Sequence, residues 1–99
     1  MDVNDVVIFV RVAQAGSFSK AAKRLGMPVS TVSRRVAELE NELGASLLFR
    51  TTRSLKITEV GQAYFEYGKA IAAEIEKAEA LASGLQSIPQ GTLKIHYLF

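Results

Sequence analysis

The run AAKRLGMPVSTVSRRV, residues 21–36, places a glycine and a proline between two stretches that each suit a helix. Gly26 can end the first stretch, because glycine adopts the left-handed conformation at a helix C-terminus without steric cost. Pro28 fits the first turn of a helix and not its interior, so a second helix is expected to begin there. Two short helices joined by a tight glycine-containing turn are typical of a helix-turn-helix.

The second helix is expected to span about residues 29–43 and to separate apolar from polar side chains. At 100° per residue, Ser30 and Arg34 point in one direction, and Ser33 and Arg35 lie on the two flanks. The opposite stripe is apolar and consists of Val32, Val36, Leu39 and Leu43. In a helix-turn-helix, the N-terminal turns of such a helix enter the major groove of DNA.

The predicted DNA contacts on this helix follow from side-chain size and hydrogen-bonding groups. Small hydroxyl side chains let the helix approach the groove and can bond a phosphate or a base edge. Arg34 can present two donors to guanine O6 and N7, whereas Arg35, on the flank, is better placed for a phosphate. The predicted contact residues are Pro28, Val29, Ser30, Thr31, Ser33, Arg34 and Arg35.

Two helices are expected ahead of the turn, one of which is the first helix of the helix-turn-helix. Residues 5–15 place Val6, Phe9, Val10 and Ala13 on one face, as in an amphipathic helix. Residues 18–25 form the first helix of the helix-turn-helix, and the Ser17 side chain can cap its N-terminus by accepting a backbone N–H. Val29 is expected to lean toward the buried side of the following helix.

A small hairpin and a long helix are expected after the turn and its two helices. The apolar runs SLLF from Ser46 and SLKIT from Ser54 alternate as half-buried strands do, and RTTR forms the tip. Thr58 can cap a helix that runs to about Leu85, a length of about 40 Å at 1.5 Å per residue. A domain this small cannot cover such a helix, which predicts that a second chain does. The dimerisation stripe is predicted as Val60, Tyr64, Tyr67, Ile71, Ala78, Leu81 and Leu85.

Composition places the chain among small folded proteins with a basic front half. Its 99 residues suit one small domain and contain no cysteine, which excludes disulfides and thiolate metal sites. Residues 1–58 carry nine Lys or Arg against five Asp or Glu, and residues 20–35 carry five bases and no acid. Such a stretch suits a polyanion. No signal peptide and no membrane-spanning run is recognisable, so a cytoplasmic location without membrane contact is expected.

The signature stretches GSFSKAAKRL, VSRRVAELENELG, LLFRTTR and ITEVG resemble the N-terminal domain of LysR-type bacterial transcriptional regulators. The resemblance implies a mostly helical winged helix-turn-helix over residues 1–58, with three helices and a two-stranded wing. It also implies a linker and dimerisation helix over 59–87. Residues 88–99 would form a hinge and the first strand of a truncated effector domain. Members bind interrupted palindromes in double-stranded DNA and answer to small-molecule inducers, and full-length proteins can be tetramers.

The resemblance also assigns roles to the wing. Arg50 and Thr51 would lie near phosphates, and Arg53 would reach the adjacent minor groove, whose narrow A·T stretches attract arginine. Three departures from the family pattern occur, at Pro28-Val29, at Leu48 and at Phe49. Leu48 stands where phenylalanine is commoner, a mild change in the core. Val29 replaces a residue that is often glutamine, so readout there would be apolar or absent. Phe49 stands where a polar residue is common and would be either exposed or folded over the base of the wing.

Other functions find less support in the sequence. The single histidine, His96, has no carboxylate or nucleophile in a recognisable arrangement beside it, so no enzyme is expected. Glu38, Glu40 and Glu42 alternate along a helix and therefore do not converge on a metal, and no cofactor is expected in this stretch. Two alternatives remain open. One is a dimerisation or protein-interaction module with a basic patch, and the other is a winged-helix regulator of another family.

Overall fold

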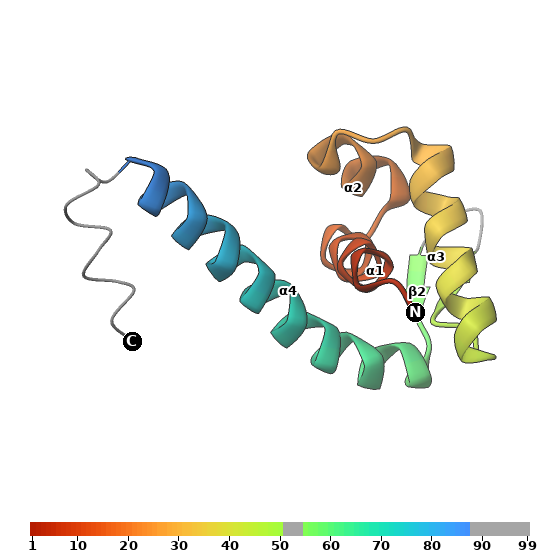
Figure 1. Cartoon of the computed structure of the whole chain (residues 1–99). Helices are drawn as coiled ribbons and strands as arrows, with labels where there is room; N and C mark the ends of the chain where they lie inside the picture. Colours follow the sequence, from red (N-terminus) through yellow and green to blue (C-terminus); the bar gives the residue numbers. More distant parts are fainter. Residues whose placement is uncertain (51–54, 88–99) are drawn as a thin grey trace.

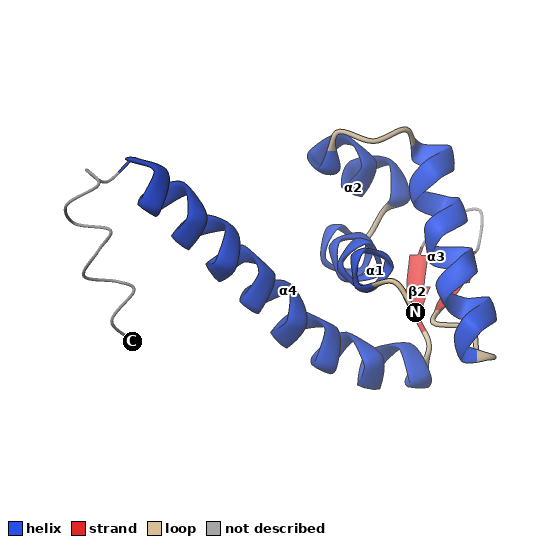
Figure 2. Cartoon of the chain, viewed as in Figure 1, coloured by secondary structure: helices blue, strands red, loops and turns tan. Residues whose placement is uncertain are grey.

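The structure is a computed structural model that describes residues 1–50 and 55–87, with side chains as far as residue 84. Helices make up most of it, and a two-stranded antiparallel hairpin lies beside them (Figure 2). The elements are, in order, α1 Val3–Ala15, α2 Phe18–Leu25, α3 Val29–Leu43, β1 Leu48–Arg50, β2 Leu55–Ile57 and α4 Glu59–Ser87. The predicted winged helix-turn-helix followed by a long helix is therefore confirmed.

The N-termini of α1 and α2 are fixed by side-chain caps. The Oδ1 atom of Asp2 accepts a hydrogen bond from the backbone N–H of Asn4 at 2.8 Å. This cap explains why α1 begins at Val3, two residues ahead of the predicted start. The Oγ atom of Ser17 accepts a bond from the N–H of Lys20 at 3.2 Å, which confirms the predicted cap of α2.

The turn between α2 and α3 has the geometry that its glycine and proline require. Gly26 has a φ of 67°, in the left-handed region, and the N–H of Met27 closes the end of α2 on the carbonyl of Ala22 at 3.0 Å. Pro28 is the N-cap of α3, with an extended backbone, and its carbonyl accepts the N–H groups of Thr31 and Val32. Helix α3 thus begins where the sequence predicts.

The core surrounds α1, which is packed by α2, α3 and α4 at once (Figure 1). For this reason α1 buries Ile8 and Val12 in addition to most of its predicted face, while Ala13 stays half-buried. On α3 the predicted stripe faces the same core, with only Leu43 left half-buried. The buried apolar residues are Val6, Ile8, Phe9, Val10, Val12, Ala21, Ala22, Val32, Val36, Leu39, Leu47, Leu48 and Ala72.

The hairpin is anchored to α3 by one carboxylate. Strands β1 and β2 pair in a register that sets Phe49 opposite Lys56. The Oε2 atom of Glu40 accepts the backbone N–H of Leu47 at 2.7 Å and that of Leu48 at 3.2 Å. Glu40 therefore fixes where β1 begins. The predicted tip, residues 51–54, lies outside the described residues.

Helix α4 begins beneath the core and then leaves it (Figure 1). The Oγ1 atom of Thr58 accepts the N–H of Gly61 at 2.9 Å, which confirms the predicted cap. At Gly68 the helix crosses α1 so closely that a Cβ atom there would lie 2.6 Å from Cγ2 of Val10. One turn further on Ala72 is still buried. The remainder of the 29-residue helix extends away from the other elements.

Candidate nucleic-acid interface

The N-terminal half of α3 presents a polar surface backed by the apolar core. Pro28, Val29 and Ser30 are exposed, and Thr31 and Ser33 are half-buried. Val29 is 48% exposed, so it does not lean toward the core as expected, because it is the first residue of α3 and the buried face of that helix begins one turn later, at Val32. The side chains at this end of α3 are all short, which leaves room for a groove of DNA to approach.

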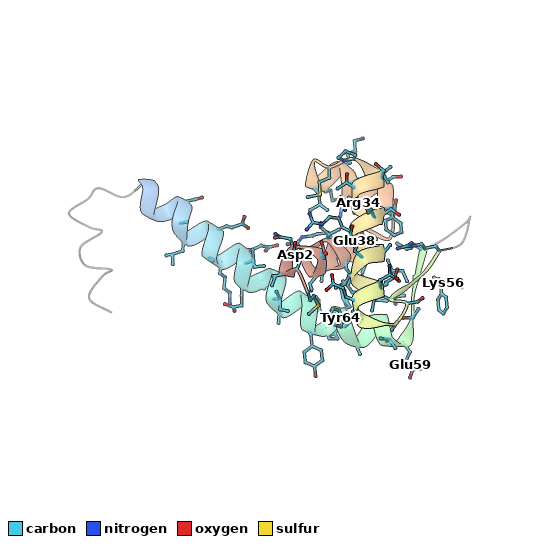
Figure 3. The ribbon with its side chains drawn as sticks, turned by 45° about the vertical axis from the view of Figure 1, so that its right-hand side comes forward. Asp2, Arg34, Glu38, Lys56, Glu59 and Tyr64 are labelled. Carbon is cyan, nitrogen blue, oxygen red and sulfur yellow. The ribbon has the colours of Figure 1, made fainter. Side chains whose placement is uncertain are left out.

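Arg34 lies on the exposed face of α3 with one weak partner. Its Nη1 atom is 2.6 Å from Oε1 of Glu38, one helical turn later (Figure 3). Both side chains are about half exposed or more, at 60% and 47%. An exposed i,i+4 pair of this kind contributes about 0.3–0.5 kcal/mol. Arg34 can therefore leave Glu38 for a stronger acceptor at little cost.

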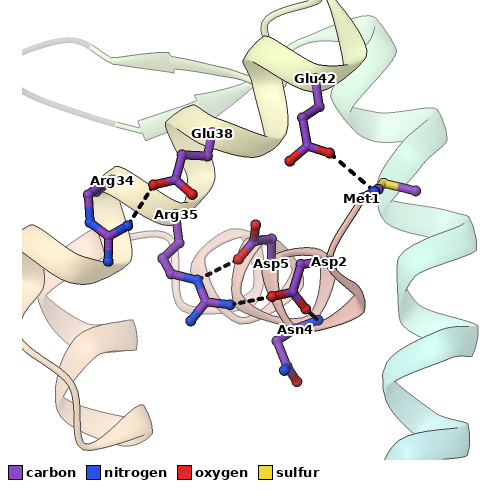
Figure 4. A network of polar contacts seen from close by, with 8 residues as sticks. All are labelled: Met1, Asp2, Asn4, Asp5, Arg34, Arg35, Glu38 and Glu42. Carbon is purple, nitrogen blue, oxygen red and sulfur yellow. Dashed lines mark hydrogen bonds and ion pairs between the residues drawn. The ribbon is translucent and has the colours of Figure 1, made fainter.

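Arg35, the next residue, is directed toward α1 (Figure 4). Its Nε atom donates to Oδ1 of Asp5 at 2.5 Å, and its Nη2 atom lies 3.1 Å from Oδ2 of Asp2. The hydrogen bond to Asp5 raises the pKa of Arg35 above its ordinary value, against partial burial, which lowers it. The charges of Asp5 and Asp2 raise it further. The predicted phosphate contact of Arg35 would require this guanidinium to leave both carboxylates.

The wing side of the site is braced by Arg50. The guanidinium of Arg50 lies 5.2 Å from the centre of the Phe18 ring, and its Nη2 atom is 3.1 Å from Oε1 of Glu40. Phe49 is 56% exposed, so it does not fold over the base of the wing. The predicted contacts of Thr51 and Arg53 lie outside the described residues and stay predictions.

The structure adds basic residues that the predicted contact set leaves out. Lys20, Lys23 and Arg24 are exposed on α2, which carries no acidic residue and lies beside the first half of α3 (Figure 1). Lys56 is exposed on β2. The run of bases in residues 20–35 was the signal that could have added the three α2 residues to the set.

Helix α4 has two apolar faces, of which only one meets its own domain. Most of the predicted dimerisation stripe is exposed: Val60 51%, Tyr67 76%, Ile71 38% and Leu81 60%, with Ala78 also exposed. Tyr64 differs, because at 100° per residue it lies between this stripe and the face that meets α1. Its ring centre is 6.3 Å from that of Phe9.

Burial raises the pKa of the Tyr64 hydroxyl above its usual value, and the charge of Glu42 adds to the effect. Tyr64 is thus half-buried at the edge of the exposed stripe, and its predicted part in dimerisation stays a prediction. Leu85, the last residue of the predicted stripe, has a side chain outside the described residues.

The described residues offer neither a metal-binding cluster nor a membrane-spanning helix. Residues 1–50 and 55–87 contain no cluster of three His, Cys, Asp or Glu side chains able to hold a metal ion. Over that part of the chain, none of the helices is both long and apolar enough to span a membrane. His96 lies outside the described residues.

These features together define a winged helix-turn-helix of the DNA-binding class. Residues 3–62 match the model of the bacterial regulatory helix-turn-helix proteins of the lysR family. The chain therefore belongs to the LysR family. This membership excludes the alternative of a winged-helix regulator of another family.

Relatives in the family agree with this assignment. A HTH-type transcriptional regulator of Xanthomonas campestris pv. campestris is 53% identical over 93 residues, which cover 94% of this chain and 27% of that protein. The HTH-type transcriptional regulator CrgA of Neisseria meningitidis serogroup C is 45% identical over 91 residues, covering 92% and 30%. The chain thus spans less than a third of the length of these relatives.

A solved protein–DNA complex has the same fold. The structure of the BenM DBD bound to catB site 1 DNA superposes with a TM-score of 0.76 and 29% identity, covering 90% of this chain and 99% of that one. The chain is accordingly a sequence-specific DNA-binding domain of a transcriptional regulator. This function also decides against the interaction module with a basic patch.

Proposed function

We propose that the chain reads an interrupted palindrome as a homodimer, with α3 in the major groove and the β1–β2 wing at the minor groove. The observation that carries the proposal is the position of Arg34. It lies in the middle of the exposed face of α3 and is 60% exposed, and among the described residues its only charged partner is the exposed Glu38. The short side chains before it leave the groove open to the helix.

Readout in the major groove would centre on Arg34, which can bond guanine O6 and N7 together. The hydroxyl groups of Ser30, Thr31 and Ser33 would bond base edges or phosphates. Pro28 and the exposed Val29 would supply an apolar contact, for instance to a thymine methyl group. Lys20 and its two basic neighbours on α2 would add phosphate contacts, which fix register without reading sequence.

The wing would contact DNA beside the half-site. We place Arg50 and Thr51 near phosphates and Arg53 in the minor groove, where narrow A·T stretches concentrate negative potential. Arg53→Ala should then lower the preference for A·T base pairs that flank the half-site, and should leave dimerisation unchanged. The measured quantity is the ratio of affinities for duplexes with A·T flanks and with G·C flanks. If this ratio is the same for Arg53→Ala and for the original chain, Arg53 does not have this role.

The dimer would form through the exposed stripe of α4. A second α4, packed nearly antiparallel, would cover Val60, Tyr67, Ile71 and Leu81, and the small Ala78 would permit close approach. Such a pair is related by a two-fold axis, so its two α3 helices would meet two half-sites of opposite direction. The symmetry of the target thus follows from the symmetry of the interface.

The longer protein would add regulation to DNA binding. Relatives more than three times as long as the chain support a following domain. We propose that this domain is an effector domain that binds a small-molecule inducer. Tetramers of the full-length protein would pair two such dimers. Since its target is the bacterial chromosome, we place the protein in the cytoplasm.

Selection of bound duplexes from a random DNA pool tests this function. The expected product is an inverted repeat whose half-sites are one helical turn apart, about 10.5 bp, or a multiple of it. Scrambling one half-site should lower affinity sharply, whereas scrambling the spacer should not. A pool that converges on a single site without symmetry would contradict the dimeric reading.

A further inference from the structure

Two adjacent arginines on α3 have different carboxylate partners, one exposed to solvent and one buried (Figure 4). Arg34 is 60% exposed and pairs with Glu38, which is 47% exposed. Arg35 is 22% exposed, and its partner Asp5 is only 4% exposed. The first pair stays within one turn of α3, whereas the second joins residues 30 positions apart in the sequence. Only the second pair therefore bears on how α3 is placed in the fold.

The buried carboxylate of Asp5 depends on Arg35 for its charge partner. A carboxylate removed from water is unfavourable unless it is paired and hydrogen-bonded. Among the ion pairs of the described residues, Arg35 is the only cationic partner of Asp5. The guanidinium meets two carboxylates at once, through Nε to Asp5 and Nη2 to Asp2, a geometry that the single ammonium of lysine does not reproduce.

The pair lies where the orientation of α3 is decided. Asp5 is in the first turn of α1, the helix at the centre of the core, and Arg35 directly follows Arg34, the proposed base contact. A rotation of α3 about its own axis would move Arg34 and Arg35 together. The Asp5–Arg35 pair opposes that rotation, because Asp5 belongs to a helix packed on three sides.

We infer that Asp5 and Arg35 are positioning residues for DNA reading, which hold the front of α3 so that Arg34 meets its base while Arg35 stays off the phosphates. This inference rests on the proposed reading of DNA by α3. It replaces the phosphate contact predicted for Arg35, and it gives α1 a part in sequence discrimination without any contact between α1 and DNA.

The test compares the 99-residue chain with Arg35→Gln, Asp5→Asn, the double variant and Arg35→Lys. Affinity is measured from 50 to 200 mM salt for two duplexes, the one selected from the random pool and one of scrambled sequence. Circular dichroism at the assay temperature confirms that each variant is folded, and Arg35→Lys keeps the charge in case Arg35→Gln does not fold.

Arg35→Gln and Asp5→Asn should each lower the ratio of selected to scrambled affinity by about five-fold or more, the lower end of what a bidentate base contact contributes. The double variant should be no worse than either single one, because both remove the same link. Arg35→Lys should lower the ratio as well. The slope of log affinity against log salt on the scrambled duplex should stay the same in Arg35→Gln.

A phosphate contact would behave differently. Arg35→Gln would then flatten that slope by about 0.9, and Arg35→Lys would keep the ratio. Either result, or additive losses in the double variant, would overturn the inference. Failure of the underlying proposal is distinguishable, since Arg34→Ala would then also leave the ratio unchanged.

Discussion

Neighbouring residues of a helix point about 100° apart, so two arginines in sequence can meet unlike surroundings. Arg34 meets Glu38 in water, where the pair is worth little and is easily exchanged. Arg35 meets a buried carboxylate on another helix. The residue type is the same, but the free energy of removing each guanidinium from its partner differs widely. Exposure of the partner thus separates the side chain that is free to read DNA from the one that holds the fold.

Arg34→Ala should weaken binding to the selected duplex by about 1–3 kcal/mol and relax the preference at one base pair, because a bidentate contact to guanine is lost. Quantitative titration and a second round of selection measure both effects. Lys77→Ala, which removes an exposed charge far along α4, is the control and should change neither. A uniform loss on every duplex would identify Arg34 as a phosphate contact instead.

At this scale the sequence predicts residue types better than partners. The serines and arginines of α3 could be placed on their faces from spacing alone, since a helix has a fixed period. The partner of Arg35 could not, because Asp5 comes 30 residues earlier and meets it only through the crossing of α1 and α3. Likewise, the sequence shows Glu40 only as one of three acids that alternate along a helix, although it holds the start of β1.

The elements themselves follow from local signals. Glycine and proline mark the turn before α3, and side-chain caps mark the starts of α2 and α4, so their bounds are close to the predicted ones. The division of α4 into a core face and an exposed stripe was harder to predict. It depends on where α1 crosses the helix, and that crossing is a property of the packed fold. The partial burial of Tyr64 against α1 could not be predicted for this reason.

The crossing gives a prediction for Gly68. Gly68→Ala should lower the free energy of unfolding by about 1–2 kcal/mol, because the added Cβ would meet Val10 at 2.6 Å and the valine is stiff. Urea unfolding measures the change. Gly84→Ala, in the same helix but with no atom within 4 Å of the added Cβ, should be neutral or stabilise by up to about 1 kcal/mol. Equal effects at both positions would contradict a tight crossing at Gly68.

The anchor of the wing gives a prediction for Glu40. Glu40→Ala should lower the free energy of unfolding by about 1–3 kcal/mol, since it leaves the N–H groups of Leu47 and Leu48 without their acceptor. Glu42→Ala, two residues later and 46% exposed, is the matched control and should change it by no more than about 0.5 kcal/mol. Unfolding curves that coincide for the two variants would show that Glu40 does not hold β1.

On the scale of the whole molecule, the length of α4 exceeds what one domain covers. Its first turns complete the core through Gly68 and Ala72, and Arg11 bonds Glu76 near the last point of contact with α1. Past that point Leu81 is 60% exposed, on the same side as Val60, Tyr67 and Ile71. An apolar stripe that runs the length of a helix is unfavourable in water. A second copy of the same helix offers a matching stripe, so the proposed dimer and the proposed two-fold symmetry of its DNA target would have one origin.

Ile71→Asp together with Leu81→Asp should convert the dimer to a monomer at micromolar concentration, because the second α4 would have to bury two carboxylates without partners. Sedimentation equilibrium measures the mass. Ala73→Asp with Ala80→Asp places the same charges on the opposite, exposed side of α4 and should leave the dimer intact. Binding to the palindrome should weaken only in the first variant, while affinity for a single half-site stays unchanged, since α3 is not altered. A dimer that survives both aspartates in the stripe would remove this face of α4 as the interface, and with it the origin proposed for the two-fold target.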